Sequence, residues 1–242
     1  MKRLLGVCAF VLCLAACKTT PSPAPQGDGF DGPPPAPRFV PSAYRADLQH
    51  TGGPHRNLYD TPSFALWVGR PVAEAKRRQA LESGVILEPG LPRDAEKIIE
   101  DFILIELHLE SAFGDMSVSY DAVAMRSVDI YLEMPDGTRH APVQRVLGKL
   151  LEADDGAIKR FKRYNLLVFP RRDYLTGDPL IPPNVPSAAL VLEGYNTRFD
   201  FEWVNLAGGH PESSHLHEAV DYARVGFQDL FLTVRRLAHV FD

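Results

Sequence analysis

Three of the eight histidines of the chain fall within one short polar segment, residues 209–218. The side chains there that could bind a metal are His210, Glu212, His215, His217 and Glu218. Neutral imidazole and carboxylate oxygens are good Zn²⁺ ligands, so a loop could gather them around one ion. The alternative is an exposed polar loop in which Ser213 or Ser214 caps the start of a helix. We favour the exposed loop and expect no cofactor.

The end of this segment comes near a zinc-protease pattern. In the HExxH pattern, two histidines one helical turn apart share a zinc ion, and the glutamate acts as general base. The sequence His217-Glu218-Ala219-Val220-Asp221 has an aspartate where the second histidine would stand. This difference argues against protease chemistry, and a metal-dependent hydrolase using His210–Asp221 is kept only as an alternative function.

A second segment could bind anions. Four cations alternate with two aromatic residues in Lys159-Arg160-Phe161-Lys162-Arg163-Tyr164. In an exported protein such a cluster could contact phospholipid head groups, lipopolysaccharide or wall polymers. The alternative, which we favour, is a solvated basic face from which Phe161 and Tyr164, three residues apart, pack inward.

Aromatic residues could form a platform for sugars, as in a carbohydrate-binding module. The candidates are Trp67, Tyr195, Phe199, Phe201 and Trp203. Phe199, Phe201 and Trp203 share one face of a predicted strand, because side chains two apart point the same way. An aromatic face of this kind more often belongs to a hydrophobic core, and we favour that interpretation.

Composition and missing motifs exclude several functions. The chain has 242 residues, a net charge of −5 and 45% hydrophobic residues, which fits a globular protein rather than a multi-span membrane protein or a coiled coil. The acidic balance argues against nucleic acid as a partner. The sequence contains no Gly-x-Ser-x-Gly, Ser-x-x-Lys or P-loop pattern. We therefore expect that the protein is not an enzyme.

The first sixteen residues have the pattern of a secretory signal peptide. A basic start, Met1-Lys2-Arg3, precedes an apolar run from Leu4 to Ala16, which is shorter than the roughly twenty residues of a transmembrane helix. The run ends in Leu14-Ala15-Ala16-Cys17. These four residues resemble the lipobox of bacterial lipoproteins: an aliphatic residue, two small residues and a cysteine. The resemblance implies that the chain is cut before Cys17, that Cys17 is lipidated, and that the lipid anchors the protein in a membrane.

The residue after the lipidated cysteine influences sorting in Gram-negative lipoproteins, where an aspartate retains the protein in the inner membrane. Lys18 stands at that position, so the resemblance implies the outer membrane, with the body facing the periplasm or the cell surface. The other two cysteines, Cys8 and Cys13, lie in the signal peptide. The mature chain would then have no free thiol for catalysis and no cysteine ligand for zinc.

The segment from the lipidated cysteine to residue 62 is rich in Pro, Gly, Ser, Thr, Ala and Asp. Few apolar residues recur in it, so it predicts a disordered linker with polyproline character. The predicted domains are a signal peptide (1–16), a lipidated linker (17–62) and a body (63–242) with its core at about 98–205.

Period-two alternation dominates the body. Ile103, Ile105, Leu107 and Leu109 alternate with Leu104, Glu106, His108 and Glu110, which predicts a half-buried strand. Further strands are predicted at 64–68, 116–124, 128–134, 165–169, 188–193 and 198–204, the last two forming a hairpin. Several short strands separated by turns favour an antiparallel β-sandwich, Ig-like or similar, with one or two short helices.

Helices are predicted at two places. Residues 72–82 are helix formers that end before Gly84, and their cluster Lys76-Arg77-Arg78 predicts a solvated face. The apolar residues from Val220 to Phe241 fit one long helix, although Gly226 would then lie mid-helix. We favour a helix ending at Gly226, followed by a strand. The whole sequence thus predicts a lipid-anchored, non-catalytic envelope module that binds a partner protein or an envelope polymer.

Overall fold

The computed structural model describes residues 38–50, 63–112, 124–154, 159–194, 197–206 and 225–238. These ranges lie within one compact unit, Pro37–Asp242. The predicted signal peptide, Cys17 and the histidine segment 209–218 lie outside the described residues. The predicted strand at 116–124 is also outside them, apart from its last residue.

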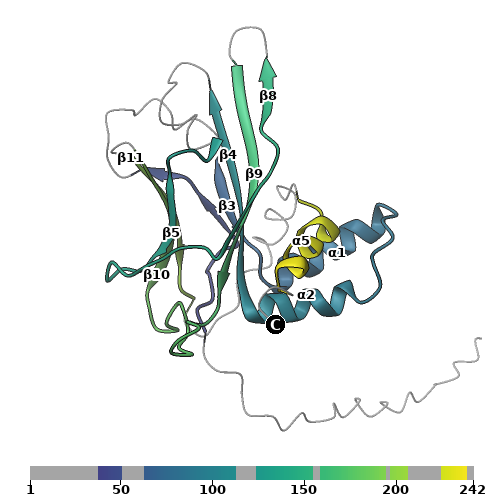
Figure 1. Cartoon of the computed structure of the whole chain (residues 1–242), viewed down its shortest axis with the longest axis horizontal. Helices are drawn as coiled ribbons and strands as arrows, with labels where there is room; N and C mark the ends of the chain where they lie inside the picture. The colour runs from purple at the N-terminus through teal and green to yellow at the C-terminus, as the bar shows by residue number, and fades with distance from the viewer. Residues whose placement is uncertain are drawn as a thin grey trace, which may run out of the picture. The chain divides into compact units, whose positions relative to one another are not determined.

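Two antiparallel sheets form the body (Figure 1). The first sheet has the order β1 (Arg45–Asp47), β3 (Phe64–Trp67), β4 (Phe102–Ala112), β9 (Lys159–Pro170) and β7 (Gln144–Leu147), and β8 (Leu151–Asp154) pairs with the other end of β9. The second sheet has the order β2 (Gln49–His50), β11 (Thr197–Val204), β10 (Ser187–Gly194), β5 (Asp129–Glu133) and β6 (Arg139–His140). The prediction of a mainly β, antiparallel sandwich is confirmed.

A hydrophobic core fills the space between the two sheets. It includes Ile105 and Leu107 from β4, Leu167 and Phe169 from β9, and residues of β5, β10 and β11. These side chains recur every second residue, as the alternation in the sequence predicts. The predicted hairpin is also present, with Ser187–Gly194 paired antiparallel to Thr197–Val204.

Three helices form a layer on the outer face of the first sheet, opposite the second sheet (Figure 1). They are α1 (Arg70–Glu82), α2 (Leu91–Asp101) and α5 (Phe227–Ala238). Their apolar residues pack against Leu66, Leu104, Leu166 and Val168 and form a second core. None of the three described helices combines the length and the apolar character that a membrane span needs.

The C-terminal prediction is corrected by this layer. We favoured a helix ending at Gly226 and a strand after it, but α5 begins directly after Gly226. The glycine therefore does not interrupt the helix. Phe227, Leu230, Phe231 and Val234 are buried on one helical face against the sheet, and this tertiary contact selects the helix.

The predicted start of the body at residue 63 is too late. Phe39, Tyr44 and Ala46 are buried, and β1 pairs with β3 of the first sheet while β2 pairs with β11 of the second. The Tyr44 carbonyl also accepts hydrogen bonds from the Trp67 backbone N–H at 2.7 Å and from the Trp203 Nε1–H at 3.4 Å. Residues 38–50 thus connect both sheets along one side of the sandwich. The apolar residues are too widely spaced among polar ones for the sequence pattern to reveal this role.

Candidate functional site

Charged side chains on the outer face of β4 are buried. The alternation predicts that Glu106, His108 and Glu110 lie on the less buried face of the strand, but Glu106 is 0% and His108 is 3% exposed. The same face of β4 carries Leu104, which packs in the second core. The part of this face that carries Glu106 and His108 is therefore buried along with Leu104. A charge buried there needs an opposite charge or a hydrogen-bond partner.

Lys76 of α1 compensates Glu106. Its Nζ lies 2.7 Å from Glu106 Oε1 and donates a hydrogen bond to the Val225 carbonyl at 2.6 Å. The Lys76 side chain is 2% exposed, so the predicted solvated face at 76–78 is wrong for this residue. The ion pair links α1 to β4, and the hydrogen bond links α1 to the residue just before α5.

His108 completes this buried group. Its Nε2 lies 3.4 Å from Glu106 Oε2, and its ring stacks on Phe64 and meets the edge of Tyr164, with centroid distances of 4.3 and 4.9 Å. Burial raises the pKa of Glu106, but the His108 hydrogen bond and the Lys76 charge outweigh burial and hold that pKa below its usual range. A carboxylate paired twice and sealed from solvent is a structural charge, because acid–base catalysis needs contact with a substrate.

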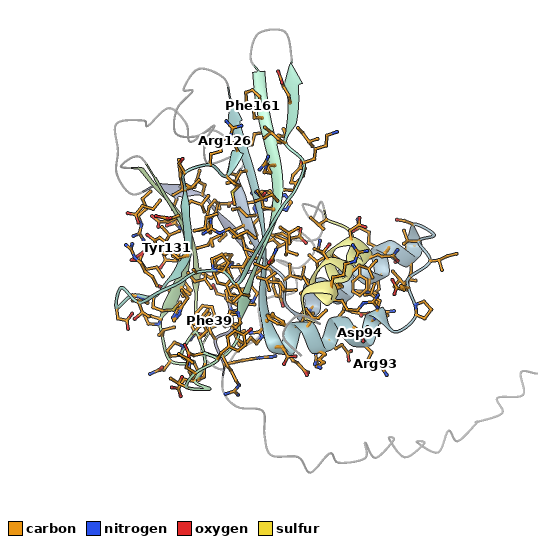
Figure 2. The ribbon with its side chains drawn as sticks, in the orientation of Figure 1. Phe39, Arg93, Asp94, Arg126, Tyr131 and Phe161 are labelled. Carbon is orange, nitrogen blue, oxygen red and sulfur yellow. The ribbon has the colours of Figure 1, made fainter. Side chains whose placement is uncertain are left out.

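The predicted basic segment is divided by the strand that contains it. Within β9, Arg160 and Lys162 point to the outer face, where they pair with Glu110 at 3.2 and 3.0 Å. Phe161 packs against the sandwich core on the opposite face (Figure 2), and Arg163 shares that face because side chains alternate along a strand.

The four cations therefore do not form one surface. Lys159 begins β9, and nothing is described of its side chain. The expectation that Phe161 and Tyr164 pack inward together is wrong, because residues three apart share a face in a helix but not in a strand.

Arg163 and Asn165 form an unusual polar group inside the sandwich. Arg163 Nη1 donates to the Ala124 carbonyl at 3.0 Å, while the buried Nε has no hydrogen-bond partner among the described residues. Asn165 is 1% exposed, and neither Nδ2 nor Oδ1 of its amide has a partner in that part of the chain. Buried polar groups are nearly always hydrogen-bonded, so these atoms require a partner, which a bound water or another ligand could supply.

A second arginine, Arg145, lies on the neighbouring strand β7, two residues before Leu147, which pairs with Asn165. Arg145 pairs in register with Leu167 of β9, and its guanidinium makes long contacts of 3.5 and 3.4 Å to the Val128 and Ile130 carbonyls of the opposite sheet. Arg163 and Arg145 thus both reach from the first sheet toward the segment around β5. Met125 and Ser127 in that segment have positive φ angles of 57° and 47°, which are uncommon for these residue types.

The sequence prediction missed two of these three residues. Asn165 had a detectable signal, because it occupies a core-facing position two residues before Leu167 and four before Phe169. A polar amide at such a position requires a partner. Arg145 lies in a short edge strand with little alternation, and its sequence offers no comparable signal.

The other predicted sites have different outcomes. Phe199, Phe201 and Trp203 are buried between the sheets, as is Trp67, so the core interpretation is confirmed and the sugar platform is wrong for these four. Tyr195 lies outside the described residues. His210, His215 and His217 also lie outside them, and the described part of the chain has no group of three His, Cys, Asp or Glu that could hold a metal.

No family model, curated protein or solved structure matches this chain.

Proposed function

We propose that the protein is a lipid-anchored envelope protein whose sandwich body binds a partner protein or an envelope polymer without catalysing a reaction. The lipobox-like Leu14-Ala15-Ala16-Cys17 supports the anchor. Lys18 after the cysteine supports the outer membrane as its location, with the body in the periplasm or at the cell surface.

The contrast between two polar groups of the body carries the proposal of a binding function. Three groups suited to acid–base chemistry, Lys76, Glu106 and His108, are buried, and Glu106 pairs with the other two. The Asn165 amide and the Arg163 Nε–H, which have no hydrogen-bond partner among the described residues, are recognition groups that neither attack a substrate nor exchange protons at neutral pH. This distribution favours binding over catalysis.

The anchor is tested by metabolic labelling with a radioactive or clickable palmitate. Wild-type protein should be labelled and recovered with membranes, whereas Cys17→Ser should lose the label. Cys13→Ser is the matched control, because this cysteine lies four residues before Cys17 and would be removed with the signal peptide; it should be labelled as wild type. Label retained on Cys17→Ser would contradict the proposal.

The binding function is tested by chemical crosslinking in intact cells, followed by detergent extraction of the full mature protein. A binding module should yield a discrete, reproducible crosslinked species that survives stringent washing. Recovery of the uncrosslinked chain alone, with turnover of an envelope substrate by the purified protein, would replace binding with catalysis.

A further inference from the structure

We propose that the side of the sandwich between β7 and β5 binds an acidic, hydroxylated ligand, such as a sugar acid of an envelope polymer. Arg145, Arg163 and Asn165 would hold it. This inference rests on the proposed binding function and specifies the chemistry that the body recognises.

The first reason is that two cations contact the same segment, residues 124–130, without a counter-charge. Neither Arg145 nor Arg163 forms an ion pair among the described residues, and both guanidinium groups contact backbone carbonyls. Two other arginines of the body do form such pairs: Arg160 pairs with Glu110, and Arg235 pairs with Asp94. The surplus positive charge between β7 and β5 therefore favours an anion.

The second reason is that buried polar atoms of Arg163 and Asn165, on the core-facing side of β9, have no hydrogen-bond partner among the described residues. The Arg163 Nε–H and one end of the Asn165 amide are donors, and the other end of the amide is an acceptor. Because both amide atoms lack partners, this conclusion does not depend on which way the amide is turned. Residues two apart on a strand lie about 7 Å apart on one face, so a single small group can reach both.

These atoms specify the ligand chemistry. A carboxylate accepts from the Arg163 Nε–H and from the amide Nδ2–H, and it compensates the guanidinium charges. The amide Oδ1 requires a donor, which a hydroxyl beside the carboxylate supplies. A neutral sugar lacks the charge, and acetate lacks the hydroxyl, so a hydroxylated acid fits best.

The exposure of the three side chains gives the ligand an entry. Arg145 is exposed, Arg163 is half-buried and Asn165 is buried. β7 is the edge strand at one end of the first sheet, and in the second sheet only the short β6 follows β5. The exposed Arg145 therefore lies at the sheet edge, and the unpaired Asn165 amide lies further inside the sandwich.

Calorimetric titration of the detergent-extracted full mature chain tests this proposal. The probes are D-galacturonate, D-galactose as the same ring without the carboxylate, acetate as a carboxylate without hydroxyls, and inorganic phosphate. We expect saturable binding of galacturonate, with the other three probes weaker by about tenfold or more, since hydrogen bonds to charged groups are the stronger class.

Three variants locate the site. Arg163→Gln and Asn165→Leu should each weaken galacturonate binding by about tenfold or more. Asn165→Leu should leave the unfolding temperature unchanged or raise it, because it removes an unpaired buried amide. Arg93→Gln is the control, since Arg93 is 88% exposed on α2, and it should bind as wild type. Should Asn165→Leu fail to fold, Arg163→Gln alone decides.

Three results would overturn the proposal: no saturable galacturonate binding, equal binding of acetate or galactose, or unchanged binding in both site variants. The proposed function is judged separately. If only the ligand class is wrong, the wild-type protein should fail to bind galacturonate but still show palmitate labelling and a crosslinked partner. If the proposed function itself is wrong, the wild-type protein should show neither the label nor the crosslinked partner.

Discussion

The buried pair of Lys76 and Glu106 allows a quantitative prediction about folding. Lys76→Met keeps the length of the side chain but leaves Glu106 with His108 as its remaining partner. Breaking one half of a buried ion pair costs about 3–5 kcal/mol, and the retained His108 contact places the expected loss near 3 kcal/mol. At about 2–4 °C per kcal/mol for a domain of this size, the unfolding midpoint should fall by roughly 6–12 °C.

The pH dependence of this loss separates charge from packing. The folded-state pKa of Glu106 lies below its ordinary value of 4.5, so the carboxylate stabilises the fold above that pH, and this contribution disappears as the pH falls through the folded pKa. In Lys76→Met, burial dominates and Glu106 protonates at a higher pH than in wild type. The stability difference between variant and wild type should therefore be largest at neutral pH and smaller near pH 4.

Urea unfolding followed by circular dichroism at pH 7 and pH 4 measures this difference. Arg78→Met is the matched control on the same helix, because Arg78 is exposed, and it should not change the unfolding midpoint. The double variant Lys76→Met/Glu106→Leu should recover most of the lost stability, since an apolar pair replaces a buried charge. A loss that is equal at both pH values, or a double variant no more stable than Lys76→Met, would refute the reasoning.

Three further predictions concern other parts of the chain. A chain starting at residue 63 should unfold or aggregate, whereas one starting at Pro37 should melt cooperatively. Phe39→Ala alone should cost about 3–5 kcal/mol of unfolding free energy. A stable chain from residue 63 would contradict the role of residues 38–50. Gly148→Ala should cost about 1–3 kcal/mol in urea unfolding, because its Cβ would lie 1.9 Å from the Tyr164 carbonyl oxygen, while Gly226→Ala should be tolerated. Metal analysis of His215→Ala/His217→Ala and wild type should find sub-stoichiometric zinc in both and no effect of a chelator on the unfolding temperature; stoichiometric zinc that survives dialysis in wild type would favour the hydrolase alternative.

The strands with strong alternation were predictable because one face of each is buried in the sandwich core. Residues of β4, β10 and β11 show this pattern directly in the sequence. The helical layer was less predictable, because burial of the second face of β4 depends not only on α2, which directly precedes this strand, but also on α1 and α5 from other parts of the chain. For the same reason the sequence could not reveal that Lys76 lies against Glu106.

The candidate binding site shows the same limit. Its residues come from β7 and β9 and face residues 124–130, which include the start of β5, so they meet only after both sheets have formed. The basic residues Arg160 and Arg163 look equivalent in the sequence, but the strand directs one to Glu110 and the other into the sandwich. Which way each arginine points depends on whether the segment is a strand or a helix. The pattern of charged and aromatic residues at 159–164 does not distinguish the two.

The most direct test of a lipid-anchored envelope protein is the mass of the N-terminal peptide of the protein isolated from membranes. The proposed function predicts a peptide that begins at Cys17 and carries a diacylglycerol on the sulfur and an acyl chain on the amine. Detergent extraction followed by protease digestion and mass spectrometry would detect it. A peptide that begins at another residue, or an unmodified Cys17 in the membrane-bound protein, would contradict the account.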